Sequence, residues 1–194
     1  MSETAPARFA DSRTSESAKA FFSFMNVGIL FSVGSSVSSA KPAARLIIVC
    51  GLPGAGKTTL ARKLEERLGG VRLNPDEWMT ALAVSLWDEA ARARIEALHW
   101  TLAQRLLETG NIVIIEWGTW ARAERDTLRD GARALGAGVE LHTVTMPIEE
   151  LWGRIETRGA EDPPITREQV AQWMRQFEAP DEDELALYDT PLLE

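Results

Sequence analysis

Two uninterrupted runs of apolar residues stand out from the mixed pattern of the chain. Residues 46–50 read Leu-Ile-Ile-Val-Cys, and residues 111–116 read Asn-Ile-Val-Ile-Ile-Glu. Short runs rich in β-branched residues, without polar alternation, are typical of parallel strands that are buried on both faces. Shorter strands are predicted at residues 71–74 and 139–145. The apolar runs are therefore predicted to lie in the interior of a parallel sheet.

Between the strands, apolar residues recur every three or four positions, which predicts amphipathic helices. In residues 60–68 the leucines fall at helical spacing until a pair of glycines ends the pattern. Further helices are predicted over residues 121–135, from Pro147, and from a capping box at Thr166–Gln169 that opens the last helix. Alternating strands and helices specify a parallel sheet with helices on both faces, which is a three-layer α/β fold.

The longest helix is predicted over residues 85–109. A capping box at Ser85–Asp88 marks its start, and Gly110 marks its end. We expect its core face to be formed by apolar residues at helical spacing, namely Ile95, Leu98, Leu102 and Leu106.

Residues 1–44 differ from the rest of the chain in composition. They are rich in Ser and Ala, and residues 35–42 are typical of a linker. The apolar segment 21–31 is too short and too interrupted for a membrane span, and acidic residues stand where a secretory signal carries basic ones. We predict a poorly ordered extension over 1–44, or a start codon placed too far upstream, rather than a docking helix or a targeting segment. A single domain is predicted over 45–194.

Charge and cysteine content narrow the classes of function. The net charge is −8, and residues 178–194 alone hold seven acidic side chains and no basic one. An acidic body offers no electrostatic footprint for a long polyanion, although a local basic pocket is compatible with it. The single cysteine, Cys50, excludes an internal disulfide and fits a reducing cytoplasm. His99 and His142 lack metal-ligand spacing and are predicted to be structural.

A glycine-rich segment joins the first apolar strand to the first helix. Residues 51–58 fit the pattern G-x-x-x-x-G-K-[ST], in which backbone N–H groups and the helix N-terminus bind phosphate. In such a loop Lys57 reaches the β- and γ-phosphates, and the Thr58 hydroxyl binds Mg²⁺. The sequence therefore predicts a nucleoside triphosphate site in a P-loop NTPase fold. The predicted nucleotide-binding residues are Gly51, Pro53, Gly54, Ala55, Gly56, Lys57, Thr58 and Thr59.

An acidic residue, Asp76, follows the second strand. Ligands of an open α/β sheet lie outside the carboxyl ends of its strands, so Asp76 is expected near the side from which an acceptor hydroxyl approaches. A carboxylate there can orient the hydroxyl and accept its proton. The segment Asn74-Pro75-Asp76 is equally good turn and helix-capping chemistry, so its residues alone leave both interpretations open.

The next strand ends at Glu116. An acid that closes an apolar strand can hold a Mg²⁺-bound water, as a Walker B residue does, or a substrate hydroxyl; the alternative is an N-cap for the following helix. Arg122 and Arg125 begin that helix. They are expected to contact substrate or to be solvated surface residues.

Two arginines, Arg154 and Arg158, share one helical face beside the Gly- and Pro-rich segment 159–164. Guanidinium groups on a closing element commonly neutralise charge on a transferring phosphoryl group. The residues predict a small arginine-bearing lid, with salt bridges to Glu150 or Glu161 as the structural alternative.

Seven tryptophans are many for a chain of 194 residues. Trp78, Trp117 and Trp120 fall at predicted strand ends, where a ring could stack on a flat ligand. The others lie on predicted helices and are more typical of a core: Trp87, Trp100, Trp152 and Trp173.

Together, these features resemble the P-loop kinase group that includes polynucleotide 5′-hydroxyl kinases, zeta toxins and chloramphenicol-phosphotransferase-like enzymes. The likeness spans about residues 46–178. It implies that Asp76 activates the acceptor hydroxyl and that Arg158 contacts the phosphates from a lid. Two departures favour an acceptor other than a nucleic-acid end. Glu116 and Trp117 stand where polynucleotide kinases tend to have Asp and Thr, and no arginine follows Asp76 at the usual spacing.

We therefore predict an ATP- and Mg²⁺-dependent phosphotransferase that moves the γ-phosphoryl group to a hydroxyl of a small molecule. Its catalytic residues are Lys57, Asp76, Arg154 and Arg158, and its metal-binding residues are Thr58 and Glu116. The alternatives are a polynucleotide 5′-hydroxyl kinase and a nucleotide-gated regulatory protein that hydrolyses ATP slowly. A guanine-specific N-K-x-D motif is absent from the sequence, which favours ATP over GTP. No membrane partner is expected, and the oligomeric state stays open.

Overall fold

The computed structural model describes residues 44–159 and 163–193. The predicted extension therefore lies outside the described residues except for Ala44, and so do residues 160–162 of the predicted lid. The strands of the described part form one parallel sheet in the order β2-β3-β1-β4. Their bounds are Arg45–Gly51 for β1, Val71–Leu73 for β2, Ile112–Ile115 for β3 and Gly138–Val144 for β4.

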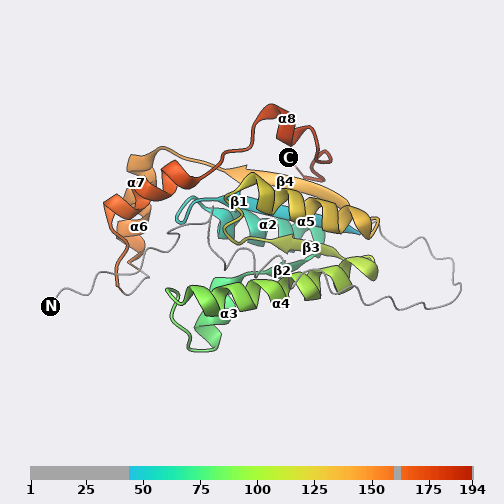
Figure 1. Cartoon of the computed structure of the whole chain (residues 1–194), viewed down its shortest axis with the longest axis horizontal. Coiled ribbons are helices and arrows are strands. Elements are labelled where there is room, and N and C mark those ends of the chain that lie inside the picture. Colours follow the sequence, from blue (N-terminus) through green and yellow to red (C-terminus); the bar gives the residue numbers. More distant parts are fainter. Residues whose placement is uncertain (1–43, 160–162, 194) are drawn as a thin grey trace, which may run out of the picture.

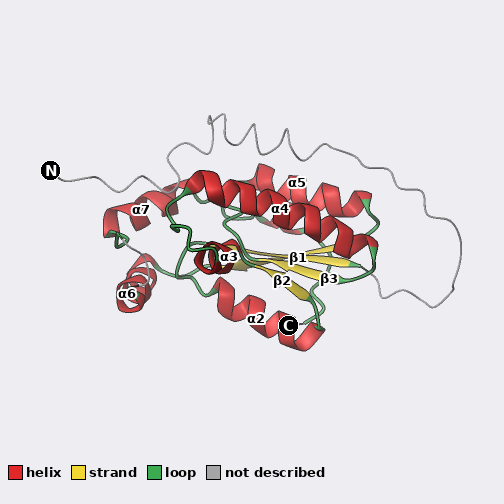
Figure 2. Ribbon diagram, turned by 90° about the horizontal axis from the view of Figure 1, so that it is seen from below, coloured by secondary structure: helices red, strands yellow, loops and turns green. Residues whose placement is uncertain are grey.

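Helices cover both faces of this sheet. Figure 2 shows the strands between α2 on one face and α4 and α5 on the other. The elements α6 and α7 project beyond the end of the sheet in Figure 1. The three-layer P-loop NTPase fold predicted from the sequence is thus confirmed. The helix bounds are Lys57–Leu68 for α2, Pro75–Ala81 for α3, Glu89–Glu108 for α4, Arg122–Ala134 for α5, Ile148–Arg158 for α6, Arg167–Gln176 for α7 and Glu182–Leu185 for α8.

The central strand β1 is buried on both sides, as its apolar sequence predicted. Leu46 and Ile48 belong to a core cluster with residues of α4 and α5, whereas Ile47 and Val49 pack against α2. All four side chains are fully buried. Because alternate residues of a strand point to opposite faces, one apolar run supplies both layers of the core.

Two predicted helix boundaries are confirmed in detail. Gly69 ends α2 in the left-handed conformation, with φ +64°, and donates a hydrogen bond to the carbonyl of Glu65 at 2.9 Å. At the start of α7 the Thr166 hydroxyl accepts from the Gln169 backbone N–H, and the Gln169 side chain accepts from the N–H of Thr166.

The start of the longest helix was predicted wrongly, and its predicted core face is correct for Ile95 and Leu106 but wrong for Leu98 and Leu102. The helix α4 begins at Glu89 with Asp88 as its cap, and Ser85 instead accepts from the Trp87 N–H in a turn before the helix. Leu98 and Leu102 are 62% and 37% exposed, because a different face of the helix, which includes His99 and Trp100, is turned inward. Its buried residues are Ala91, Ile95, His99, Trp100, Ala103 and Leu107.

The acidic segment at the C-terminal end packs on the domain. Arg125, predicted to contact substrate or solvent, is fully buried and makes a two-point ion pair with Glu184 of α8, with N–O distances of 2.6 and 2.8 Å. Both readings of Arg125 are therefore wrong. Asp189 accepts from the Val139 N–H at 2.8 Å and pairs with Arg133 at 2.6 Å. These long-range ion pairs join the segment to α5 and β4.

A second apolar cluster connects the glycine-rich loop to α6 and α7. Its members include Leu52 and Ala55 from the loop, Ile155 from α6 and Trp173 from α7. Trp120, which follows β3, belongs to the same cluster, and its ring centroid lies 6.1 Å from that of Trp173. The sequence between β3 and α5 thus meets the predicted lid helices beside the loop. Across residues 44–159 and 163–193, every helix is too short or too polar to cross a bilayer.

Candidate functional site

A cavity of about 430 Å³ opens at the carboxyl ends of the strands. Its size is within the usual range for small-ligand sites. Most residues predicted for the site line it, from the glycine-rich loop, β2–α3, the end of β3 and α6. Gly51 and Ala55 are the two predicted site residues that do not. The lining residues are Pro53, Gly54, Gly56, Lys57, Thr58, Thr59, Asn74, Pro75, Asp76, Arg92, Glu116, Trp117, Gly118, Trp120, Arg154 and Arg158.

We call residues 51–58 the donor loop. Three of its glycines have positive φ, and two of them also leave no room for a side chain. A Cβ on Gly51 would lie 2.3 Å from the Val144 carbonyl oxygen, and one on Gly54 would lie 2.8 Å from Cγ1 of Ile155. The donor loop therefore packs directly on β4 and α6, and glycine is required there both by conformation and by space.

Lys57 is the first residue of α2, so it lies where the positive end of the helix dipole meets the donor loop. Its Nζ donates to the Leu52 carbonyl at 3.1 Å across the loop. The Trp120 indole N–H donates to the Gly51 carbonyl at 3.3 Å. Trp120 therefore ties the start of the donor loop to the segment after β3.

The candidate base Asp76 lies in the first turn of α3. Asn74 caps this helix by accepting from the Glu77 N–H at 3.1 Å, so the capping interpretation of this segment is correct for Asn74. Asp76 itself is half-exposed at the cavity wall, and Nη2 of Arg92 pairs with its Oδ1. We call Asn74, Pro75, Asp76 and Arg92 the acceptor wall, because they line the cavity together from the β2–α3 segment and α4.

Glu116 lies at the end of β3 with its side chain fully buried. Its Oε1 accepts from Nη1 of Arg72 at 2.7 Å and from the Asn74 amide. Burial raises the pKa of this carboxyl above its usual range, while the positive charge of Arg72 and the hydrogen bond from Asn74 act in the opposite direction. The alternative role of Glu116 as a helix cap is wrong, since the N-cap position of α5 is occupied by Ala121.

Arg72 of β2 joins three carboxylates from three elements. Besides Glu116 it contacts Glu65 of α2 at 3.0 Å and Glu77 of α3 at 2.8 Å. Burial alone would lower the pKa of Arg72, but its hydrogen bonds to Glu77 and Glu65 raise it above the usual value. The guanidinium therefore stays charged and fixes Glu116 in place.

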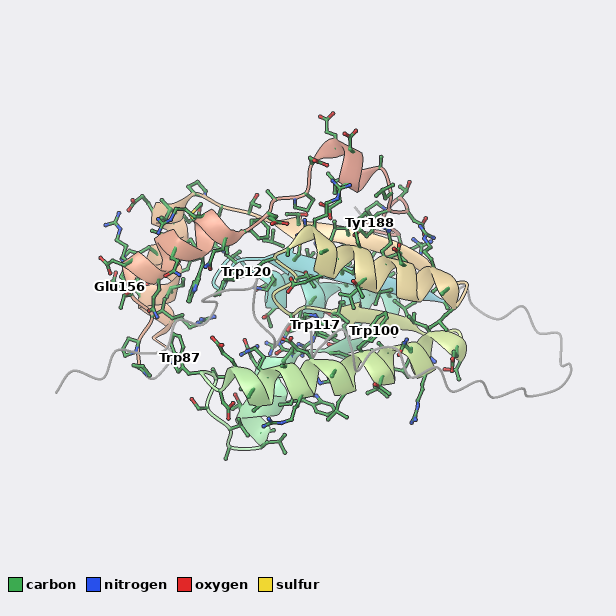
Figure 3. The ribbon with its side chains drawn as sticks, in the orientation of Figure 1. Trp87, Trp100, Trp117, Trp120, Glu156 and Tyr188 are labelled. Carbon is green, nitrogen blue, oxygen red and sulfur yellow. The ribbon has the colours of Figure 1, made fainter. Side chains whose placement is uncertain are left out.

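Behind the cavity, His99 lies between two tryptophans. Its ring is stacked on Trp117 at a centroid distance of 5.9 Å and meets the edge of Trp78 at 4.4 Å. Burial lowers the pKa of His99 to about 4, so the imidazole is neutral at physiological pH. The predicted structural role of His99 agrees with this packing. Trp117 and Trp120 line the cavity and Trp78 does not, so ligand stacking stays a prediction for the first two (Figure 3).

Both predicted lid arginines line the cavity from α6. Nη1 of Arg154 lies 3.7 Å from the position that a Cβ on Gly56 would take, so this guanidinium is next to the donor loop. Arg154 also pairs with Glu150 at 2.7 Å, which was the structural alternative. Since both residues of that pair are about half exposed, the salt bridge contributes little stability and leaves Arg154 able to change partners.

A metal ion at this site would depend on few protein ligands. The described residues contain no cluster of three or more His, Cys, Asp or Glu side chains that could chelate a cation. However, Oε2 of Glu116 is buried and has no hydrogen-bond partner in the described part of the chain. Mg²⁺ commonly binds one or two protein oxygens and takes the rest from phosphates and water, so Thr58 and Glu116 fit this ion.

Three residues of the site were not singled out from the sequence as functional: Arg72, Asn74 and Arg92. Asn74 carried a capping signal and no more. Arg92 stands 16 residues after Asp76 on another helix, and its guanidinium pairs with Asp76 in space. No pattern in the sequence marked either arginine, because each is brought to the site by packing between separate elements.

The family model described as an AAA domain matches residues 46–180. The chain belongs to this family. The predicted likeness to the P-loop kinase group is confirmed at the level of family and fold. No curated protein matches the chain significantly in sequence.

Solved structures of similar fold include three from different contexts. One belongs to the Pnkp1/Rnl/Hen1 RNA repair complex, with 24% identity and a TM-score of 0.59; 73% of this chain is covered but only 46% of the other. A gluconokinase from Sinorhizobium meliloti has 17% identity and a TM-score of 0.52, with 73% and 79% covered. Kti12 from Chaetomium thermophilum, solved in complex with ADP-AlF3, has 23% identity and a TM-score of 0.55, with 70% and 81% covered.

Proposed function

We propose that this protein is an ATP- and Mg²⁺-dependent phosphotransferase whose acceptor is a hydroxyl group of a small molecule. The observation that carries the proposal is that Asp76 and the donor loop line one and the same cavity. A phosphate loop alone accounts for nucleotide binding. A carboxylate in the same cavity, which can accept the proton of a hydroxyl group, accounts for a phosphoryl acceptor as well.

The donor loop and the acceptor wall support different parts of the reaction. The acceptor oxygen forms a bond to the γ-phosphorus of ATP while the bond from that phosphorus to the β–γ bridging oxygen breaks. The hydroxyl proton passes to Asp76, and ADP leaves with the bridging oxygen. Lys57 and the loop N–H groups hold the phosphates, and Arg154 and Arg158 balance their charge from α6.

Thr58 and Glu116 are the residues that would hold Mg²⁺, which, when bound, neutralises phosphate charge and orients the oxygens. Arg72 and Asn74 hold Glu116 by Oε1. This arrangement leaves Oε2 as the oxygen for a cation or its bound water.

The neighbours in fold are consistent with this proposal. They include a gluconokinase and Kti12 in complex with ADP-AlF3. Both identities are below 25%, so they support a nucleotide-dependent phosphotransferase in general terms and leave the acceptor open.

A polynucleotide 5′-hydroxyl kinase is the second candidate. It is favoured by the similarity to the RNA repair complex, of whose matched chain this protein spans 46%. The net charge of −8 argues against it, because binding a polyanion rests mainly on positive charge. A nucleotide-gated regulatory protein is the third candidate, and Asp76 on the acceptor wall argues against it.

Transfer of label from γ-labelled ATP tests the proposal. The panel should contain hydroxyl-bearing metabolites, antibiotics and 5′-hydroxyl oligonucleotides, with EDTA-treated samples as the control for Mg²⁺. We expect a labelled small-molecule phosphomonoester that depends on Mg²⁺. Labelling of oligonucleotides alone would favour the second candidate, and release of free phosphate alone would contradict any kinase.

A further inference from the structure

We propose that Arg92 is a positioning residue for Asp76 rather than a binding group for an anion, so that the acceptor of this site is an uncharged hydroxyl compound. This inference rests on the proposed phosphotransferase function. It goes beyond that function by naming the charge class of the acceptor and a further residue that acts through the base.

The contacts of Arg92 commit its guanidinium to the protein. Nη2 pairs with Oδ1 of Asp76 and lies 3.5 Å from the Leu86 carbonyl, while Nη1 lies 4.0 Å from Glu96. The side chain is only 13% exposed. Three oxygens from three positions thus surround Nη1 and Nη2 of Arg92, with the contact to Asp76 the shortest, whereas the buried Nε has no hydrogen-bond partner in the described part of the chain.

The two helices that carry this pair are fixed to each other by a small core. Met79 of α3 is fully buried and forms a cluster with Ala91 and Ile95 of α4, each 6% exposed. Arg92 follows Ala91 directly, so its position relative to Asp76 is set by packing and does not depend on the ion pair alone. A residue placed in this way can restrict the orientation of the carboxylate.

The other guanidinium groups next to the acceptor wall are also paired. Arg72 contacts Glu65, Glu77 and Glu116, and Arg62 contacts Glu77 at 2.9 Å. Three arginines therefore face five carboxylates in this network. The carboxylates are Glu65, Asp76, Glu77, Glu96 and Glu116.

An anionic group on the acceptor would meet unfavourable electrostatics at this wall. To bind it, Arg92 would have to release Asp76, which would leave a carboxylate beside the incoming anion. Like charges placed together in a partly desolvated site repel each other. The remaining cations of the cavity, Lys57, Arg154 and Arg158, lie on the donor loop and α6, where the phosphates of ATP need them. A neutral polyol, sugar or nucleoside meets no such penalty.

Matched pairs of acceptors that differ by one charged group test the inference with the full-length protein. Suitable pairs are glycerol with glycerate, glucose with gluconate, and a nucleoside with its 3′-phosphate. For every pair that is used, we expect kcat/KM of the neutral member to exceed that of the charged member at least about tenfold, as a penalty of 1.4 kcal/mol or more requires.

Arg92→Met separates positioning from anion binding. As a positioning residue, Arg92 should affect kcat for the neutral acceptor, with a fall of about 10²-fold and little change in its KM. Arg92→Lys, which retains the charge, should recover part of the rate. The matched control is Arg94→Met, because Arg94 is an exposed arginine on the same helix.

The outcomes distinguish this inference from the function on which it rests. A wild-type preference for the charged members, or an Arg92→Met effect confined to the KM of charged acceptors, would overturn the inference while the phosphotransferase function stands. Release of free phosphate with no transfer to any compound would overturn both.

Discussion

The donor loop and the acceptor wall face the same cavity but are held in place by different forces. The donor loop is fixed by backbone conformation and close contact, with Gly51 against β4 and Gly54 against α6. The acceptor wall is fixed by charged side chains, with Arg72 and Arg92 joining carboxylates of separate elements. Steric constraints are insensitive to salt and pH, whereas ion pairs respond to both. The wall should therefore be the more easily perturbed half of the site.

A large loss of activity should follow removal of the charge on the donor side. Lys57→Ala should lower kcat/KM for phosphoryl transfer by about 10²–10³-fold, as expected for one preorganised electrostatic contact in a transition state. Lys63→Ala on the same helix is the matched control, since Lys63 is exposed and outside the cavity. Steady-state kinetics measure both variants. Equal rates for Lys57→Ala and wild type would show that the donor loop is not the phosphate site.

On the acceptor side, Arg72→Met should lower stability. The substitution leaves the fully buried Glu116 carboxylate without its cation, which costs about 3 kcal/mol in the free energy of unfolding. Urea unfolding followed by tryptophan fluorescence measures the change. The control is Arg62→Met, whose pair with Glu77 is exposed and contributes less than about 1 kcal/mol. Similar losses in the two variants would contradict the role given to Arg72.

Acid should weaken the acceptor side further through His99. Burial lowers the pKa of this histidine from 6.5 to about 4, so between these values the unfolded chain takes up a proton that the folded protein does not. Stability is therefore lost as the pH falls from 6.5 toward 4, by about 2 kcal/mol at pH 5. Unfolding free energies of wild type and His99→Met across this range measure the effect. If the unfolding free energy of His99→Met depended on pH as that of wild type does, another group would cause the effect. His142→Gln is the control variant.

The two halves also differ in how far the sequence predicts them. The donor loop belongs to a contiguous motif between a strand and a helix, so the residues from Pro53 to Thr59 could be named from the pattern. Most of them line the cavity. Asp76 and Glu116 could be proposed because they follow strands. Arg72 and Arg92 could not, because the site residues that they contact, Glu116 and Asp76, belong to other elements and meet them only through the packing of the fold.

The same limitation explains the errors in the prediction of the fold. Four apolar positions at regular helical spacing were expected to form the core face of α4. Instead, His99 and Trp100 fill the interior, and Leu98 is exposed. Arg125 had the sequence character of a surface residue, and only the return of α8 toward α5 buries it. Local pattern predicted the strands, the longer helices and their order along the chain, but not the short helices α3 and α8. It did not predict which partner each face meets.

The central claim is that Asp76 accepts the proton of an acceptor hydroxyl. The variant Asp76→Asn tests this claim most directly. Asparagine keeps the size of the side chain and removes its capacity to accept the proton, so transfer to a hydroxyl acceptor should fall by about 10²–10⁴-fold. The dissociation constant for ATP should stay within about twofold, because Asp76 lies on α3, outside the donor loop that holds the phosphates. Asp183→Asn, an exposed position on α8, serves as the control. Wild-type turnover in Asp76→Asn, with turnover abolished in Lys57→Ala, would contradict the assignment of this protein as a kinase.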